Sequence, residues 1–352
     1  MYKFSYFRKV LLHKFRRKFL AYEKLFPYNI IEIESYVSKL NLEFERKKVY
    51  AYPRTYSAYH PVERFSKSKY FNFRYVYHVK NVIVNTTSGY VFSDHKHLVL
   101  ESSSWPSTLH KFALAPGVSF APLRSKIPSM YSGIVLPSNK NFYHWLIEDM
   151  PLFLEARQRN KDLPVIVNTK IPNYVRDFVV HENIPQTHHD GYVNLVEYEF
   201  TGRDQDPNWP DPIDLSHVRK YFVKLELLRD PELKIYISRL SSSRSPIFEN
   251  ELVEQLSVNN WVIVHLENLN LYEQFKLFAS AKVVAGLHGA GLSGIVWLSS
   301  GCKVVEICDL DWRYTPVFSR ISAILDLNYE YLYYSNSNAD SINGVFLKLL
   351  SL

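Results

Sequence analysis

Short apolar runs alternate with segments of helical composition between residues 234 and 307, and this alternation restricts the possible folds more than any other feature of the chain. The runs are rich in β-branched residues, which is typical of strands in a parallel sheet covered on both faces. We expect such strands at 234–239, 261–265, 282–286 and 303–307, with helices at 250–258, 271–281 and 289–298. The pattern predicts an α/β unit of the Rossmann-like type, whose ligands bind beyond the carboxyl ends of the strands.

The region before this unit also mixes strands and helices. A hairpin is expected from strands at 81–84 and 90–92, because the turn Asn85–Gly89 between them is rich in residues that favour tight reversals. Two more strands are expected at 133–137 and 164–168, and a helix at 141–157. Residues 201–212 are dense in turn formers and form the best candidate boundary. The predicted parts are a basic helical segment at 1–75, an α/β domain at 76–212, a Rossmann-like domain at 213–335 and a tail or helix at 336–352.

Much of the formal net charge of +7 lies at the start of the chain. Basic and apolar residues interleave there at roughly helical spacing, as in a helix on an anionic membrane surface or a solvated helix packed on its own domain. Both interpretations remain open. No apolar run approaches the ~20 residues that cross a bilayer, and charges interrupt the apolar centre that a signal peptide needs. We expect a cytoplasmic protein, either soluble or peripheral on the inner face of the membrane. Nucleic-acid binding would rest on charge alone, and no nucleic-acid partner is expected.

The two cysteines, Cys302 and Cys308, lie close together in the sequence. Two neighbouring cysteines argue against a disulfide framework and fit a reducing compartment.

A glycine-rich segment, Ala285–Leu292, follows an expected strand and opens an expected helix. Glycines let the backbone approach a ligand closely, and a helix N-terminus presents free N–H groups to an anion. The candidate phosphate-binding residues are His288, Gly289, Ala290, Gly291 and Leu292. By spacing alone, a glycine-rich turn with a structural histidine is an equally good interpretation.

The expected helix at 141–157 carries a second candidate group. His144 and Glu148 are four residues apart and therefore share a helix face. A carboxylate beside an imidazole can act as a general base toward a sugar hydroxyl. The alternative is a capped helix, with Asn141 near its start and His144 paired with Glu148 on its surface. Spacing alone slightly favours that structural alternative.

Charged residues also lie near the ends of two later strands. Arg239 ends one strand and Arg244 follows a serine-rich loop, so the two arginines suit a phosphate clamp, although solvated loop charges are common. Glu306 lies near the end of a further strand, where a carboxylate can accept ribose hydroxyls. Two Asp-x-Asp triplets, 204–206 and 309–311, are able to bind a divalent metal. No further ligand pattern supports them, so no metal site is expected.

Taken together, these elements resemble glycosyltransferase family 61. The first shared motif is an Asn-x-x-His-Trp helix with an acidic residue and a proline beyond it, here Asn141, His144, Trp145, Glu148 and Pro151. The later shared elements are Ile237–Arg239, Arg244, Asn250–Glu251, Trp261–Val264, Glu273–Gln274, His288–Leu292, Gly301 and Val304–Glu306. The resemblance covers roughly residues 133–307. Ser299 and Ser300 depart from it, because relatives commonly carry prolines there.

The resemblance implies a GT-B-like fold, with two Rossmann-like domains facing a cleft. An N-terminal helical or β extension, which the resemblance does not cover, is expected before them. The domain at 76–212 would serve the acceptor and the domain at 213–335 the donor. Glu148 or Asp149 would be the catalytic base, with His144 orienting it or the substrate. The acceptor would be oriented by Asn141 and Trp145. The donor diphosphate would be held by Arg239, Arg244 and the amides around Gly289 and Gly291.

The predicted function is an inverting glycosyltransferase, of hexosyl or pentosyl type, that uses a nucleotide-sugar donor and needs no cofactor or divalent metal. Its acceptor would be a hydroxyl of a glycan or lipid-linked glycan, in capsular or cell-surface polysaccharide synthesis. The alternative is a non-catalytic scaffold that binds a glycan or nucleotide sugar in an assembly complex. The presence of both the acidic helix and the phosphate-binding turn argues against that alternative.

Overall fold

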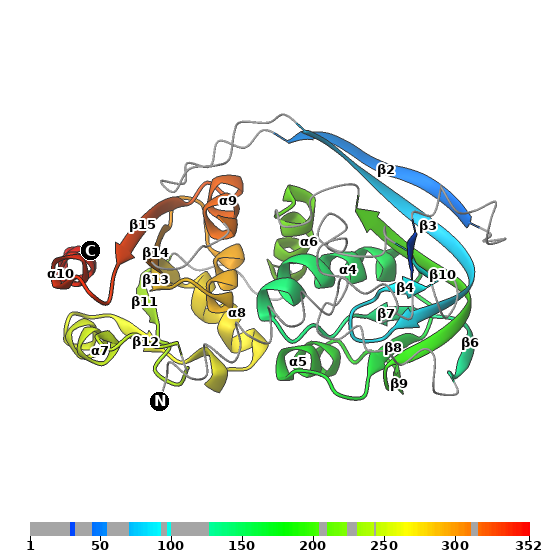
Figure 1. Ribbon diagram of the computed structural model, residues 1–352, viewed down its shortest axis with the longest axis horizontal. Coiled ribbons are helices and arrows are strands. Elements are labelled where there is room, and N and C mark those ends of the chain that lie inside the picture. Colours follow the sequence, from blue (N-terminus) through cyan, green and yellow to red (C-terminus); the bar gives the residue numbers. More distant parts are fainter. Residues whose placement is uncertain are drawn as a thin grey trace.

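The computed structural model describes residues 29–31, 44–54, 70–92, 97–99, 127–203, 210–223, 231–242, 244–310 and 316–352. These residues form a mixed α/β structure with parallel sheets, as predicted, arranged as two halves side by side (Figure 1). The helix predicted near the start of the chain lies outside the described residues. In the described parts of 1–75, β1 (Asn29–Ile31) and β2 (Phe44–Arg54) are strands, whereas the expected extension was helical or β. Their backbones bond to neighbouring strands, β1 to β5 and β2 to β3, instead of within a helix.

The C-terminal half contains a sheet of five parallel strands in the order β12-β11-β13-β14-β15. The strands are β11 (Leu233–Ile237), β12 (Val262–Val264), β13 (Ala281–Leu287), β14 (Lys303–Asp309) and β15 (Asn328–Tyr334). The first four confirm the alternation in the sequence. The strand order reverses at β11, because β12 lies on one side of it and β13 on the other. In open sheets of this kind the ligand crevice lies at the carboxyl ends of the strands, where the order reverses.

Helices cover both faces of this sheet (Figure 1). The outer face carries α7 (Glu249–Val258) and α10 (Ala339–Leu350). The inner face carries α8 (Leu271–Ala279), the 3₁₀ helix η6 (Ala290–Trp297) and α9 (Val317–Ile324), while the short η5 (Leu266–Asn268) follows β12. Side chains alternate along β13, so that Val283 and Ala285 join the outer core and Val284 joins the inner one.

In the N-terminal half, a small parallel sheet lies between a larger mixed sheet and a group of helices. The small sheet contains β7 (Ile134–Leu136), β8 (Val165–Asn168) and β9 (Gln186–His189). Its residues Val135 and Ile166 pack against the mixed sheet, whereas Ile134 and Val165 pack on the helical side. The mixed sheet contains β1, β2, β3 (Tyr70–Asn85), β4 (Val91–Phe92), β5 (His97–Val99), β6 (Ser129–Ser132) and β10 (Tyr192–Arg203).

The predicted hairpin is confirmed within the mixed sheet. Strands β3 and β4 pair antiparallel through Ile83 with Phe92 and Val84 with Val91. Gly89 takes a left-handed φ of 74°, which favours glycine, and the Asn85 side chain accepts backbone N–H bonds from Thr87 and Ser88. The turn chemistry read from the sequence therefore describes the actual turn.

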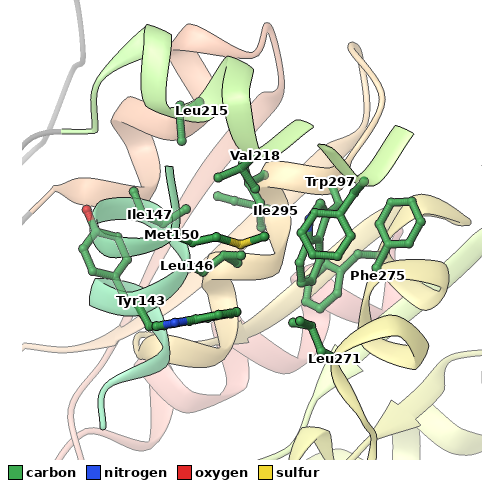
Figure 2. Close-up of a cluster of buried hydrophobic side chains, with 14 of the residues drawn as sticks. Tyr143, Leu146, Ile147, Met150, Leu215, Val218, Leu271, Phe275, Ile295 and Trp297 are labelled. Carbon is green, nitrogen blue, oxygen red and sulfur yellow. The ribbon is translucent and has the colours of Figure 1, made fainter. Parts of the chain in front are cut away.

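Among the described residues, the helices of the N-terminal half are the π-helix η4 (His144–Asp149), which continues into α4 (Met150–Arg159), then α5 (Asn173–His181) and α6 (Pro212–Val223). Their apolar side chains share one continuous core with the inner helices of the C-terminal half (Figure 2). Leu146 and Met150 meet Ile295 and Trp297 there, and the Phe222 and Trp297 rings lie 4.9 Å apart. The two halves are therefore joined by packing. The predicted arrangement of two Rossmann-like domains around a cleft stays a prediction.

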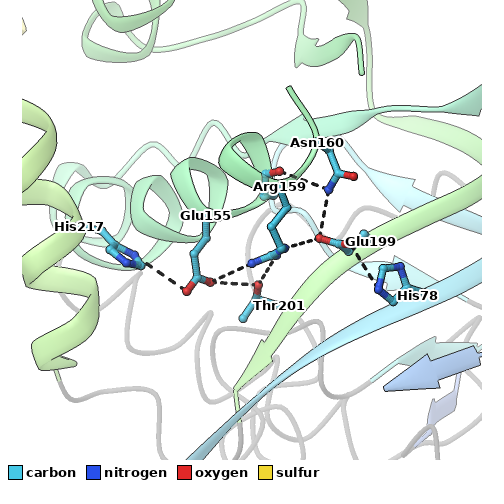
Figure 3. A network of polar contacts seen from close by, with 8 residues as sticks. His78, Glu155, Arg159, Asn160, Glu199, Thr201 and His217 are labelled. Atoms are coloured by element: carbon cyan, nitrogen blue, oxygen red, sulfur yellow. Dashed lines mark hydrogen bonds and ion pairs between the residues drawn. The ribbon is translucent and has the colours of Figure 1, made fainter. Parts of the chain in front are cut away.

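A chain of polar contacts ties the helices of the N-terminal half to its mixed sheet (Figure 3). Arg159 donates to Glu199 at 2.6 Å and to Thr201 at 3.1 Å, and it lies 3.7 Å from the buried Glu155. His217 of α6 extends the chain on the other side of Glu155, at 4.0 Å. The residues predicted as a boundary, 201–212, lead from β10 into α6, with 204–209 outside the described ranges.

Within the described residues, none of the helices combines the length and the apolar character that crossing a membrane requires. Both cysteines are free and buried, in agreement with the expected lack of a disulfide framework.

Candidate functional site

A cavity of about 340 Å³ opens at the carboxyl ends of β11, β12 and β13, where the strand order reverses. Its volume lies within the range of about 300–1,000 Å³ that is usual for small-molecule sites. Its lining comes from three loops, one after each strand: Ile237, Ser238, Arg239, Ser241, Ser242 and Arg244; Leu266 and Glu267; and Leu287, Gly289, Ala290 and Gly291. The arginines and the glycine-rich turn predicted to bind a phosphate therefore lie together around one cavity.

Arg239 is held against the glycine-rich turn. Its Nη1 donates to the carbonyl of His288 at 2.7 Å. A Cβ atom on Gly289 would lie 3.2 Å from the same nitrogen, so the missing side chain makes room for the guanidinium. The turn and the arginine thus form one cationic wall of the cavity, where five N–H donors of a guanidinium suit phosphate oxygens.

The loop that carries Arg239 is organised by Glu249, a residue that the sequence interpretation missed. Glu249 is fully buried at the start of α7. Its carboxylate accepts the backbone N–H of Arg239 at 2.6 Å, the hydroxyl of Ser245 at 2.6 Å and the hydroxyl of Tyr236 at 3.3 Å. Burial and the charge of Glu249 raise the pKa of Tyr236. Glu249 directly precedes the Asn250–Glu251 pair, but its role depends on a loop geometry that no local pattern reveals.

The glycine-rich turn leads into a 3₁₀ helix, η6, and not into the α-helix that the sequence suggests. Gly294 allows this close path, because a Cβ there would lie 2.3 Å from the ring of Phe278 on α8. The amides of Ala290 and Gly291 lie in the first turn, where N–H groups lack partners within the helix. They line the cavity and present positive dipole ends to it. Leu292, predicted to bind the donor, is buried in the core and does not line the cavity.

Glu306 serves His288 and does not line the cavity. Its Oε1 pairs with His288 Nδ1, and its Oε2 accepts the hydroxyl of Tyr329 at 2.5 Å. Burial, with the charge of Glu306 second, raises the pKa of Tyr329 well above its ordinary value. Since both carboxylate oxygens are engaged and the residue is buried, this geometry does not support the predicted contact between Glu306 and a ribose. It makes Glu306 the group that orients His288.

His288, Glu306 and Cys308 form the one grouping of at least three potential metal ligands among the residues that the structure describes. Their ligand atoms lie within 4.8 Å of one another. Glu306 is hydrogen-bonded to both of the others, to His288 Nδ1 and to the Cys308 thiol at 3.7 Å. Burial, with the charge of Glu306 second, raises the pKa of that thiol, whereas a metal ligand must be the thiolate. The geometry thus fits a hydrogen-bonded cluster, and the expectation that no metal is required stays a prediction.

The second predicted group lies on a π-helix. In η4, Met150 N–H bonds to the carbonyl of Trp145, five residues back. Such turns are rare and recur at functional sites. His144 Nδ1 lies 2.9 Å from Glu148 Oε2, and the side chain of His144 is 22% exposed while that of Glu148 is 4% exposed. The pairing predicted from the spacing is therefore present, with the histidine as its accessible member.

The other predicted residues of this helix, Asn141, Trp145 and Asp149, make contacts within the protein itself. Asn141 accepts the backbone N–H of Tyr143 at 3.0 Å, as the capped-helix interpretation expects. Trp145 is fully buried, with its ring 5.1 Å from Tyr174, which corrects its predicted role of contacting an acceptor. Asp149 is buried as well, and its charge adds to burial in raising the pKa of Tyr174. Of the predicted catalytic residues, His144 is the most accessible.

The two histidine–glutamate pairs come from different halves but approach a common aromatic ring, Phe318 of α9. His288 meets Phe318 with ring centroids 5.4 Å apart. On the other side, Tyr143 meets Phe318 at 5.8 Å and the adjacent His144 ring at 5.3 Å. The glycine-rich turn and the π-helical pair are thus linked by a short run of edge-to-face ring contacts.

The glycine-rich turn beside the arginines and the imidazole–carboxylate pair on the π-helix are the features to compare with known proteins. Residues 142–305 match the family model described as Glycosyltransferase 61. This match confirms the resemblance inferred from the sequence: residues 142–305 are similar to glycosyltransferase family 61, which points to glycosyl transfer in general. The matched region includes His144, Glu148, Arg239, Arg244 and the turn 288–292, while Asn141 and Glu306 lie just outside it. No curated protein matches the chain.

Proposed function

We propose that this protein is an inverting glycosyltransferase that moves a hexosyl or pentosyl group from a nucleotide-sugar donor to a hydroxyl of a glycan acceptor. The observation that carries the proposal is the cavity at the strand-order reversal, where Arg239, Arg244 and the first turn of η6 converge. These groups suit a diphosphate, which is the anionic part of a nucleotide sugar.

On the donor side of the proposed reaction, the protein stabilises the negative charge of the departing diphosphate. When the bond between the anomeric carbon and the diphosphate oxygen breaks, the electron pair stays with the diphosphate and its negative charge grows. Arg239 is fixed by its bonds to Glu249 and His288, so its guanidinium is oriented before the reaction. Preorganised donors of this kind lower the barrier most when they face the atom that gains charge. His288, oriented by Glu306, supplies a further donor next to the turn.

The acceptor half of the chemistry needs a base. Glu148 and Asp149 are both buried, whereas His144 is partly exposed and bonded through Nδ1 to Glu148. We therefore assign proton removal to His144 Nε2, with Glu148 as the positioning residue that holds the Nδ1–H tautomer. The acceptor oxygen attacks the anomeric carbon as its proton passes to Nε2. Attack opposite to the departing diphosphate inverts the configuration.

The biological setting proposed for this reaction is capsular or cell-surface polysaccharide synthesis. The acceptor would be a glycan or a lipid-linked glycan, at the cytoplasmic face of the membrane. The family supports sugar transfer, and the basic start of the chain supports contact with an anionic surface. No cofactor takes part in the proposed steps, so full activity is expected after treatment with a chelator.

The test is transfer or hydrolysis by the purified protein with a panel of nucleotide sugars, followed by mass spectrometry of the products. Arg239→Ala should abolish turnover of any active donor and weaken nucleotide binding. His188→Ala is the matched control, because His188 is exposed on β9, away from both pairs. Nucleotide binding without turnover across all donors and acceptors would favour the non-catalytic scaffold.

A further inference from the structure

We propose that Glu267 holds the ribose of the donor and makes the protein selective for ribonucleotides over 2′-deoxyribonucleotides. The inference rests on the proposed use of a nucleotide sugar and names the residue that recognises its ribose. Glu267 lies in η5, directly after β12, and lines the same cavity as Arg239 and Arg244. It was not among the residues that the sequence indicated.

The order of the strands defines where each part of the ligand lies. The glycine-rich turn follows β13, the arginine loop follows the neighbouring β11, and Glu267 follows β12 at the edge of the sheet. A diphosphate bound by Arg239 and the η6 turn therefore lies over β11 and β13. A nucleoside attached to it has room to extend toward β12, where Glu267 is the carboxylate in the lining.

The chemistry of the lining supports this direction. A carboxylate repels a diphosphate, but it accepts two O–H bonds from a vicinal diol. In nucleotide-binding sheets an acidic residue beyond the carboxyl end of a strand takes this role, and Glu267 lies directly beyond β12. Leu266 and Ile237 supply apolar contact surface in the same cavity.

Glu267 differs from the other acidic residues nearby because its side chain is exposed to solvent. Its side chain is 48% exposed, with Oε1 4.0 Å from His265 Nδ1. Glu306 and Glu249 are buried and already accept several hydrogen bonds. Of these three carboxylates, Glu267 is the one able to receive hydroxyls from a ligand in the cavity.

The experiment is isothermal titration calorimetry of the full chain with UDP, GDP, ADP and CDP, each compared with its 2′-deoxy form. For the diphosphate that binds best, the 2′-deoxy form should bind the wild-type protein about tenfold more weakly. Glu267→Ala should weaken the ribose form by a similar factor and make the two forms equal. Glu267→Gln should fall between the two proteins. Glu254→Gln, an exposed change on α7, should behave as wild type.

The possible outcomes distinguish the assignment of Glu267 from the broader proposal that the protein binds a nucleotide-sugar donor. If the ribose and deoxyribose forms bind equally to the wild-type protein, or if Glu267→Ala keeps the preference, the assignment of Glu267 is wrong while nucleotide binding stands. If no nucleoside diphosphate binds, the proposed donor and the role of Glu267 both fall. Equal melting temperatures of the variants show that a loss of binding is not a loss of folding.

Discussion

Glu148 Oε2 lies 2.9 Å from His144 Nδ1 within one turn of π-helix, and the carboxylate is the more deeply buried of the two. Spacing alone would leave the Glu148 side chain on the surface of a helix. In the structure this side chain is only 4% exposed. In the proposed mechanism Glu148 accepts Nδ1–H, which makes Nε2 the nitrogen that accepts the proton. The proposal thereby gives His144 the role of base and Glu148 that of its positioning residue.

His144→Ala should lower kcat by about 100- to 10,000-fold, the usual contribution of a general base, with little change in the KM for the donor. Glu148→Gln should lower kcat less, because the imidazole remains and loses only its orienting partner. Steady-state kinetics with both variants measures the difference. Full turnover in His144→Ala together with inactive Glu148→Gln would return the base to Glu148.

Gly289→Ala should weaken binding of a nucleoside diphosphate by about tenfold, because its Cβ would lie 3.2 Å from Arg239 Nη1 and displace the guanidinium. Calorimetric titration measures the affinity. Gly344→Ala is the matched control: it lies in α10, and its Cβ would meet nothing within 4 Å. That control should bind normally and gain up to about 1 kcal/mol of stability from better helix propensity. Normal binding by Gly289→Ala would show that binding does not depend on this position of the Arg239 guanidinium.

Tyr329→Phe should reduce the loss of stability at alkaline pH. Burial and the charge of Glu306 raise the folded-state pKa of Tyr329 above its ordinary value of 10.0. Above pH 10 the unfolded chain therefore loses a proton that the folded protein keeps, so the free energy of unfolding falls as pH rises. One such tyrosine contributes up to about 1.4 kcal/mol per pH unit. Other tyrosines whose pKa is raised, including Tyr198 and Tyr221, retain part of the slope in the variant.

Urea unfolding at a series of alkaline pH values measures this effect. Tyr131→Phe is the control, because Tyr131 is 67% exposed. An unchanged slope in Tyr329→Phe would show that the pKa of the Tyr329 hydroxyl is not raised in the folded protein.

Arg159→Met should destabilise the N-terminal half by about 1–3 kcal/mol, because Glu155 is buried and loses a charged neighbour, while Glu199 loses a donor. Chemical denaturation measures the change, with the exposed Lys161→Met as control. Combining Arg159→Met with Glu199→Gln should destabilise less than the sum of the single changes. Strict additivity would mean that the 2.6 Å contact carries no energy.

The sequence predicted the strands of the C-terminal sheet well, because buried parallel strands are apolar runs that stand out without their partners. It missed β15 (Asn328–Tyr334), where tyrosines and Glu330 interrupt the apolar pattern. Leu292 and Trp145 were assigned to ligand contacts because they stand in shared motifs, yet each is buried. A shared motif indicates that a residue is needed, but it does not distinguish a contact with a ligand from packing in the core.

The cavity itself could not be predicted from the sequence, for a different reason. Glu267 and Glu249 gain their positions from the lateral order of the strands and from the path of one loop, which depend on contacts between distant residues. Arg239 and the glycine-rich turn were found because both follow strands directly. Residues that directly follow a strand can therefore be predicted once the strand itself is predicted. Residues that reach the same cavity from a neighbouring strand or loop cannot.

The helix η6 begins at the cavity wall and ends at Trp297, inside the core that joins the two halves. A hinge rotation that opened the halves would expose Trp297 and its partners to water, at about 1.5–3 kcal/mol for each large apolar side chain. Donor exchange is therefore expected to depend on small local displacements near Arg244, and the spacing between the bound diphosphate and His144 should stay constant through the catalytic cycle.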